Sequence, residues 1–296
     1  MTITQLQVFL AVADRSSFTA AAGSLVMSQS AVSHALASLE RELGAPLLER
    51  GPGRPVALTE LGRRVAADAR ELVRRSERIA EQSSSYLGLE AGKLRVASVV
   101  SVASRVLPSL LGRFRTRHPR VEVVVHEGAD PEVHDWLVGG VADVGFLAIP
   151  LDGLEVVGTV TEDPFMAVLP AAHQLAARSA IRPDELSREP FVISRSGCEP
   201  LITAWFGSCP PRIEYEVRSV DTMVGFVREG LGVTILPELV HPEDTTGLAI
   251  RPLDPPATRR VVLARAAGIE PTPAIGAFLR EVMPAAAPEP PTPPAV

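Results

Sequence analysis

The stretch Ser17–Gly44, SFTAAAGSLVMSQSAVSHALASLERELG, decides the fold of the N-terminal part of this chain. Ser17 carries a side chain preferred at a helix N-cap and opens an alanine-rich run that ends at Leu25. Val26 and Met27 follow as a short turn, and Ser28 is a second N-cap candidate. The pattern therefore predicts two short helices joined by a tight turn.

The second of these helices has an apolar and a polar face. Its apolar positions are Val32, Leu36, Leu39 and Leu43, with Ala35 beside them. Its polar positions are Gln29, Ser30, Ser33, His34, Ser38 and Arg41. Short polar side chains at the start of a helix can hydrogen-bond base edges and phosphates, and glutamine can pair bidentately with adenine. The helix suits the major groove of DNA, although a surface helix of an ordinary bundle would also show a polar face.

The flanking segments complete a winged helix-turn-helix pattern. Thr4 and Gln7 have capping-box spacing ahead of a helix with one buried face. After Gly44, the apolar runs 47–48 and 56–58 enclose a Gly/Pro/Arg tip. This predicts a β-hairpin wing, with Arg50 and Arg54 placed to contact phosphate or the minor groove.

A long helix is predicted from Thr59, its N-cap, to about Tyr86. Its positions 65, 69, 72, 76, 79, 83 and 86 alternate steps of four and three residues, which is a 3.5-residue seam. We interpret this as a dimerisation helix, and packing against its own domain is the alternative. Two helix-turn-helix units on a two-fold dimer would bind a pseudo-palindromic site.

The charge balance limits how DNA could be bound. The whole chain has a net charge of −6, and residues 1–90 contain ten arginines and ten acidic residues. Because no basic footprint exists, DNA affinity would depend on the motif and on a few placed arginines. No apolar run approaches the ~18 residues of a membrane span, and the N-terminus lacks the basic region of a signal peptide. Together with only two cysteines, this indicates a cytoplasmic protein without membrane contact.

The rest of the chain alternates strand-like and helical segments. KLRVASVV, VEVVVHEG and DVGFLAI are strand-like, with helices expected between them. A similar alternation follows Pro164, and RRVVLARAA is expected to return the chain to the first lobe. The alternation predicts two lobes built on parallel α/β sheets. Strand carboxyl ends and helix N-termini converge between such lobes, which favours a small acidic or polar ligand there.

The N-terminal segment resembles the signature of LysR-type transcriptional regulators. The resemblance covers LQVFLAVADRSSFTAAAGSLVMSQSAVSHALASLERELGAPLLER and the following VALTELG. The stretches LRVA and VREGLGVTILPE extend the resemblance, since the regulatory half of that family is similar to periplasmic binding proteins. The resemblance implies an all-α winged helix-turn-helix followed by a two-lobed, periplasmic-binding-protein-like α/β domain. It implies transcription regulation through double-stranded DNA, a small-molecule effector, RNA polymerase and a homodimer or homotetramer. The residues implied to face DNA are Ser28, Gln29, Ser30, Ser33 and His34, with Arg50 and Arg54 on the wing.

Two departures concern the base preference. Many family members have proline at the position of Ser30, and arginine or glutamine at that of His34.

The same resemblance implies an effector site between the lobes. Its residues would be Val99, Val100, Ser101, Glu127, Gly128, Ser194, Ser196, Gly197, Cys198, Asp221 and Thr222. Val99 stands where many members place a hydroxyl, and the carboxylates of Glu127 and Asp221 would repel an anion. Ordinary loop and cap roles are the alternative for each residue.

A redox-sensing alternative rests on Cys198 and Cys209, because SGCEPLITAWFGSC resembles the cysteine pair of peroxide-sensing family members. Arg265 would match a basic residue that activates the thiol there, whereas Glu199 would raise the thiol pKa. Gly197 stands where those sensors carry histidine.

No metal, cofactor or catalytic motif is apparent. The six histidines are scattered, and the G-x-G of REGLGVTILP precedes a strand instead of following one. We therefore expect a regulator and not an enzyme, with a two-lobed solute-binding protein or enzyme as the remaining alternative. The expected domains are 1–58 for DNA binding, 59–88 for the linker helix and 92–283 for the effector. Lobe 1 is expected over about 92–162 and 266–283, lobe 2 over about 163–265, and a disordered tail over 284–296.

Overall fold

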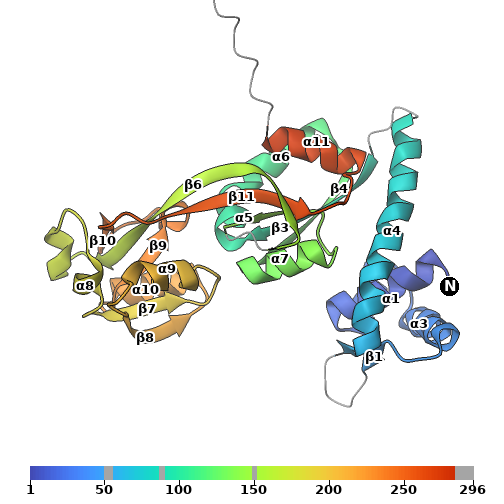
Figure 1. Ribbon diagram of the computed structural model, residues 1–296, viewed down its shortest axis with the longest axis horizontal. Coiled ribbons are helices and arrows are strands. Elements are labelled where there is room, and N and C mark those ends of the chain that lie inside the picture. The colour runs from blue at the N-terminus through green and yellow to red at the C-terminus, as the bar shows by residue number, and fades with distance from the viewer. Residues whose placement is uncertain (50–55, 87–90, 149–151, 284–296) are drawn as a thin grey trace, which may run out of the picture.

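The computed structural model describes residues 1–49, 56–86, 91–148 and 152–283, and the following account concerns these (Figure 1). An N-terminal helical domain is followed by one long helix and by an elongated α/β domain of two lobes. Within the described ranges, no helix combines the length and apolarity that crossing a membrane requires.

The N-terminal domain confirms the predicted helix-turn-helix. Its elements are α1 (Ile3–Arg15), α2 (Phe18–Ser24), α3 (Gln29–Leu43), β1 (Leu48–Glu49) and β2 (Ala57–Leu58). Ser17 and Ser28 cap α2 and α3, since their hydroxyls accept hydrogen bonds from the backbone N–H groups three residues on. Phe9, Leu36 and Leu47 are fully buried in one core that joins the helices to the hairpin.

Two details of this domain differ from the expectation. The capping box lies at Thr2 and Gln5, not at Thr4 and Gln7, because α1 begins at Ile3 and its orphan N–H groups are therefore earlier. Leu43 is 39% exposed, since it lies in the last turn of α3, beyond the buried part of that face.

The long helix is α4 (Glu60–Tyr86), and the hydroxyl of Thr59 accepts the Gly62 N–H as predicted for its N-cap. Ala66, Ala69 and Val73 are buried in the core of the N-terminal domain. These three residues have i, i+3, i+7 spacing and lie on the face of α4 that packs against α1. Position 69 of the predicted seam is therefore buried within its own chain and is not free for a partner subunit. Further along the seam, Leu72 and Ile79 are 42% and 69% exposed.

Lobe 1 has a sheet covered by helices. Its elements are β3 (Ala91–Val99), α5 (Val100–Arg105), α6 (Leu107–Arg117), β4 (Arg120–Gly128), α7 (Asp130–Val138), β5 (Val144–Leu147) and α11 (Pro273–Val282). β3 pairs in parallel with β4 and β5, as the alternation predicted. Phe114, Phe146 and Phe278 are fully buried and meet edge to face in its core.

Two long strands connect the lobes. β6 (Leu154–Pro170) leaves lobe 1 and β11 (Thr258–Ala266) returns to it, and the two pair antiparallel (Figure 1). The expected parallel pairing is present in each lobe, but β6 and β11 add antiparallel pairs because they run between the lobes in opposite directions. β11 already pairs with β5 at Val262, so the chain re-enters lobe 1 before the expected residue 266.

Lobe 2 carries the remaining elements. These are η1 (Gln174–Ala177), α8 (Pro183–Leu186), β7 (Pro190–Ser194), α9 (Glu199–Phe206), β8 (Arg212–Val217), α10 (Val220–Arg228), β9 (Thr234–Pro237), η2 (Glu238–Val240) and β10 (Leu248–Pro252). β9 and β10 both pair antiparallel with β6, whereas β7 and β8 are parallel. The strands β6 and β11 run through both lobes, so residues at their middle lie at the junction of the lobes.

Candidate DNA interface and effector site

The polar face of α3 is available at the surface. Ser28, Gln29, Ser30 and His34 are exposed, and Ser33 is half-buried. The Ser28 hydroxyl accepts the Ala31 N–H at 3.1 Å, and the Ser28 and Ser30 hydroxyls are 2.9 Å apart. The two serines thus build the N-terminus of the helix, which leaves Gln29 and His34 as its long exposed polar side chains.

Ser38, which was grouped with this face, has a different role. It is half-buried, and its hydroxyl accepts a hydrogen bond from the Gln5 side chain at 3.2 Å. This contact joins α1 to α3 and removes Ser38 from the surface that could meet DNA.

The turn before α3 is unusual. Val26 has a φ of 53° and is 94% exposed. A β-branched residue in the left-handed region is a conformational outlier, because its side chain crowds the backbone there. The turn is therefore held by its surroundings: the Met27 N–H bonds the Ala22 carbonyl at 3.0 Å.

The base of the predicted wing is present. Leu48 pairs with Leu58 and Glu49 with Ala57, in antiparallel register. The predicted wing residues Arg50 and Arg54 lie outside the described residues.

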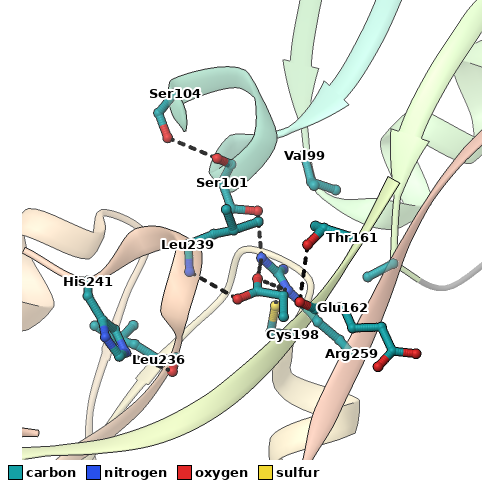
Figure 2. Close-up of polar contacts among 12 residues, drawn as sticks. Val99, Ser101, Ser104, Thr161, Glu162, Cys198, Leu236, Leu239, His241 and Arg259 are labelled. Carbon is teal, nitrogen blue, oxygen red and sulfur yellow. Dashed lines mark hydrogen bonds and ion pairs between the residues drawn. The ribbon is translucent and has the colours of Figure 1, made fainter. Parts of the chain in front are cut away.

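At the junction of the lobes, one arginine gathers residues from three elements. Arg259 of β11 donates from Nη2 to the Ser101 hydroxyl at 2.7 Å, and its Nη1 lies 3.1 Å from the Cys198 sulfur. Figure 2 shows Ser101 of α5 and Cys198, the N-cap of α9, on either side of this guanidinium. We call Ser101, Cys198, Arg259 and Asp163 the interlobe cluster.

Asp163 of β6 completes the cluster. Its Oδ2 accepts from Nε and Nη2 of Arg259 at 2.9 and 2.7 Å, and its Oδ1 accepts the Leu239 N–H at 2.9 Å. Arg259 and Asp163 are 3% and 1% exposed. A charge pair this deeply buried requires good geometry and satisfied lone pairs to offset its desolvation, and this pair has both.

The structure brings together only part of the predicted effector site. Val99 is buried beside Gly128 in the β3–β4 register, with Val100 and Ser101 following, while Glu127 pairs with Ser98 and its side chain is exposed. The Ser194 and Ser196 hydroxyls are 2.5 Å apart, close in sequence to Cys198. Asp221 and Thr222 are exposed at the start of α10, and no contact joins them to the interlobe cluster within the described residues.

The two lobes also meet at Gly197. A Cβ on this residue would lie 3.0 Å from the backbone nitrogen and Oδ2 of Asp130 at the start of α7. Gly197 has a φ of 109°, which other residues rarely adopt. Glycine here therefore permits both the turn and the close approach of lobe 2 to lobe 1.

Comparison with known protein families fits both halves of this arrangement. Residues 3–63 match the bacterial regulatory helix-turn-helix of the lysR family, and residues 87–287 match the LysR substrate binding domain. The chain belongs to the LysR family of transcriptional regulators. It is a DNA-binding regulator with an effector-binding domain.

Curated LysR-type relatives match over nearly the whole chain. A probable HTH-type transcriptional regulator, LrrA, of Synechococcus elongatus is 35% identical over 295 residues, which cover 98% of each chain. The uncharacterized HTH-type regulator YvbU of Bacillus subtilis is 33% identical over 89% of this chain and 91% of its own. A probable hydrogen peroxide-inducible genes activator of Streptomyces viridosporus is 34% identical over 95% and 94%. These relatives are transcriptional regulators.

Solved LysR-family structures share the fold. A full-length OxyR variant from Pseudomonas aeruginosa superposes with a TM-score of 0.72 at 24% identity, covering 96% of this chain and 95% of its own. Full-length CbnR in complex with its target DNA gives a TM-score of 0.63 at 23% identity, covering 95% and 99%.

The two cysteines of this LysR-type regulator are free and are not placed for a disulfide in the folded structure. Cys198 and Cys209 lie beyond opposite ends of α9, whose eight residues span ~12 Å, whereas a disulfide needs Cα atoms within ~7 Å. Burial raises the pKa of the Cys198 thiol, and Asp130 and Glu199 add to this against the opposing charge of Arg259. The cation on the thiol is thus Arg259, and not Arg265, which contacts Glu155 instead.

Sequence reasoning missed Arg259 and Asp163, the buried ion pair of the interlobe cluster in this LysR-type regulator. Both lie in strands, 96 positions apart, and neither belongs to a local motif. Other charged residues stand beside them in the same strands, such as Glu162 and Arg260, so charge alone did not distinguish Asp163 and Arg259. Among the described residues, no group of three or more His, Cys, Asp or Glu side chains is placed to hold a metal ion.

Proposed function

We propose that this regulator binds a pseudo-palindromic site on double-stranded DNA as a homo-oligomer and is controlled by a small molecule bound between its lobes. The observation that carries the proposal is the interlobe cluster, in which Arg259 hydrogen-bonds Ser101 of lobe 1 and approaches Cys198 of lobe 2. A ligand that changes either contact changes how the lobes are held.

On the DNA side, Gln29 and His34 read base edges, while Ser28, Ser30 and Ser33 position the start of α3 against the backbone. Gln29 and His34 are exposed, as are Ser28 and Ser30, while Ser33 is half-buried beside them, and the opposite face of the helix is buried, which supports this assignment. Arg50 and Arg54 would add phosphate or minor-groove contacts. Because residues 1–90 carry no net positive charge, affinity depends on pairing two such units.

Exposed apolar residues on α4 support the oligomer. Leu72 and Ile79 are seven positions apart, so they lie on one helix face, where a second copy would cover them. The subunits form a homodimer or, through a second interface, a homotetramer. The complex of CbnR with its target DNA supports DNA binding by a related chain of the same fold.

The effector offers a hydrogen-bond acceptor to Arg259 beside Ser101 and Cys198. Asp163 already neutralises the guanidinium, so a polar group suffices and a full negative charge is not required. Val99, Val100, Gly128, Ser194 and Ser196 line the same region in this proposal. Glu127, Asp221 and Thr222 would join only if the lobes rotate toward one another.

Effector binding changes the angle between the lobes, and through α4 it changes the spacing of the two DNA-reading helices. The altered complex then contacts RNA polymerase differently. Such a regulator acts in the cytoplasm, where bacterial DNA is transcribed.

A gel shift with DNA upstream of the protein's own coding sequence tests the DNA part. The effector part is tested by a thermal-shift screen of metabolites on wild type and Ser101→Ala. A ligand at 100 times its Kd stabilises by about 2.7 kcal/mol, and the variant should respond less. A footprint that stays unchanged across the metabolites that bind would contradict effector control.

A further inference from the structure

A cavity lies between α4 and lobe 1, away from the interlobe cluster. Its volume is about 660 Å³, which suits a small ligand. One wall is the C-terminal half of α4, and the other is formed by β3 and the segment 265–275. None of the residues of the interlobe cluster lines it.

Most charges in its walls are already paired. Arg95 donates to Glu77 at 2.6 Å and approaches Asp143 at 3.6 Å, which ties β3 to α4. Arg75 pairs with Glu71 at 2.6 Å. Two polar side chains of α4 in this wall each keep a buried atom without a hydrogen-bond partner among the described residues.

The first is the carboxylate of Glu81, which is only 6% exposed. Its Oε1 accepts the Lys93 N–H at 3.2 Å, but its Oε2 is buried and accepts no hydrogen bond within the described part of the chain. Gly92 makes room for this group, since a Cβ there would lie 2.7 Å from the Glu81 carboxyl carbon. Burying a carboxylate oxygen without a hydrogen-bond donor costs free energy. Glu81 Oε2 therefore suits a ligand that supplies a donor.

The second is the guanidinium of Arg74, which packs against Gly140, where a Cβ would lie 2.8 Å from Nη2. Its Nε is buried and donates to no acceptor among the described residues. Burial also lowers the pKa of Arg74, and the nearby Asp143 only partly opposes this. The Arg74 guanidinium therefore has one buried N–H group that lacks an acceptor.

These two groups are seven positions apart, so they project from one face of α4, separated by two turns or ~10 Å. Ile269 and Ile275 contribute apolar surface to the same cavity. We propose that the cavity binds an aliphatic amino acid with its charges at opposite ends, the ammonium on Glu81 and the carboxylate on Arg74. Rotation about the soft terminal torsion of Glu81 turns Oε2 toward the ligand. Because the walls belong to the linker helix and to lobe 1, the bound ligand fixes the angle between them.

The test uses calorimetric titration of the full-length chain with 6-aminohexanoate, compared with hexanoate and hexylamine. The two-headed ligand should bind roughly tenfold more tightly than either one-headed ligand, because each charged hydrogen bond contributes about that factor. Glu81→Gln should abolish the preference over hexanoate, and Arg74→Gln the preference over hexylamine. Glu60→Gln and Arg64→Gln, which break an exposed ion pair at the other end of α4 and outside the cavity, should leave all three affinities unchanged.

Absence of binding to the wild type at millimolar ligand would overturn the proposal, and so would equal binding of hexanoate. The ligand series on the wild type decides this even if a variant fails to fold. Unchanged preference in Glu81→Gln would also reject the site. Ser101→Ala should bind 6-aminohexanoate as the wild type does. Loss of binding in this variant would mean that the ligand binds between the lobes, which would reject this cavity but not the proposed effector control.

Discussion

Arg259 and Asp163 form a buried ion pair that joins the two strands connecting the lobes, with two hydrogen bonds of 2.7 and 2.9 Å. The pair also reaches both lobes, through Ser101 and Leu239. The pair therefore ties the crossover between the lobes to a residue of each lobe.

Asp163→Asn should destabilise the effector domain by about 3–5 kcal/mol, because it leaves the Arg259 guanidinium buried without its counter-charge. Urea unfolding of the full-length chain measures this. Glu216→Gln, which breaks the exposed pair with Arg195, is the control and should change stability little. Equal effects of the two variants would mean that burial does not strengthen the Arg259–Asp163 pair.

Gln29→Ala should weaken specific operator binding by about 1–3 kcal/mol and relax the sequence preference at one position of each half-site. Titration gel shifts on the operator and on base-substituted operators provide the measurement. Gln174→Ala changes the same side chain on lobe 2 and should bind normally. An unaffected Gln29→Ala protein would show that α3 is not the recognition helix.

Val26→Asn should stabilise the N-terminal domain by about 1 kcal/mol, because asparagine tolerates the left-handed backbone that valine resists. The midpoint of thermal unfolding should rise accordingly. Val138→Asn is the matched control, since this exposed valine lies in the last turn of α7 and carries no such strain. A lower midpoint for Val26→Asn would mean that the valine side chain itself holds the turn.

Two histidines should change the pH dependence of stability in opposite directions. Burial lowers the folded-state pKa of His126, so the unfolded chain binds its proton more readily and stability is lost as pH falls below about 6.5. The hydrogen bond to the Asp152 carbonyl raises the pKa of His134, so its contribution is present at low pH and is lost as pH rises through the folded pKa.

Denaturant unfolding at pH 5.5 and 7.5 tests this pair. His126→Gln should reduce the loss of stability on acidification, whereas His134→Gln should increase it. Identical pH profiles for both variants would contradict the assignment.

Peroxide should not link Cys198 to Cys209 in the folded protein, because α9 separates them and burial keeps the Cys198 thiol protonated. Peptide mapping after peroxide treatment should show no peptide cross-linked through the two cysteines. DNA binding by the wild type should not change after peroxide treatment, and DNA binding by Cys198→Ser should behave in the same way. Detection of the cross-link under native conditions would require α9 to unwind and would revive the redox alternative.

Local patterns predicted the helix-turn-helix well because α2 and α3 are each capped by a serine next to them in the sequence. Ser17 and Ser28 act within three residues of their partners, so the sequence alone contains the whole interaction. The alternation of strands and helices likewise predicted two α/β lobes. The seam along α4 was harder, since the burial of Ala69 depends on a helix more than fifty positions away.

The sequence by itself determined the class of this protein: a helix-turn-helix with a polar reading face, a long linker helix and two α/β lobes. Only the tertiary structure decided which residues meet between the lobes and along α4. Arg259, Asp163, Ser101 and Cys198 come from four separate segments, and the unpartnered groups of Arg74 and Glu81 are recognisable only once lobe 1 covers them. The physical reason is that caps and periodicity act within a few residues, whereas burial and charge pairing depend on chain segments that folding alone brings together.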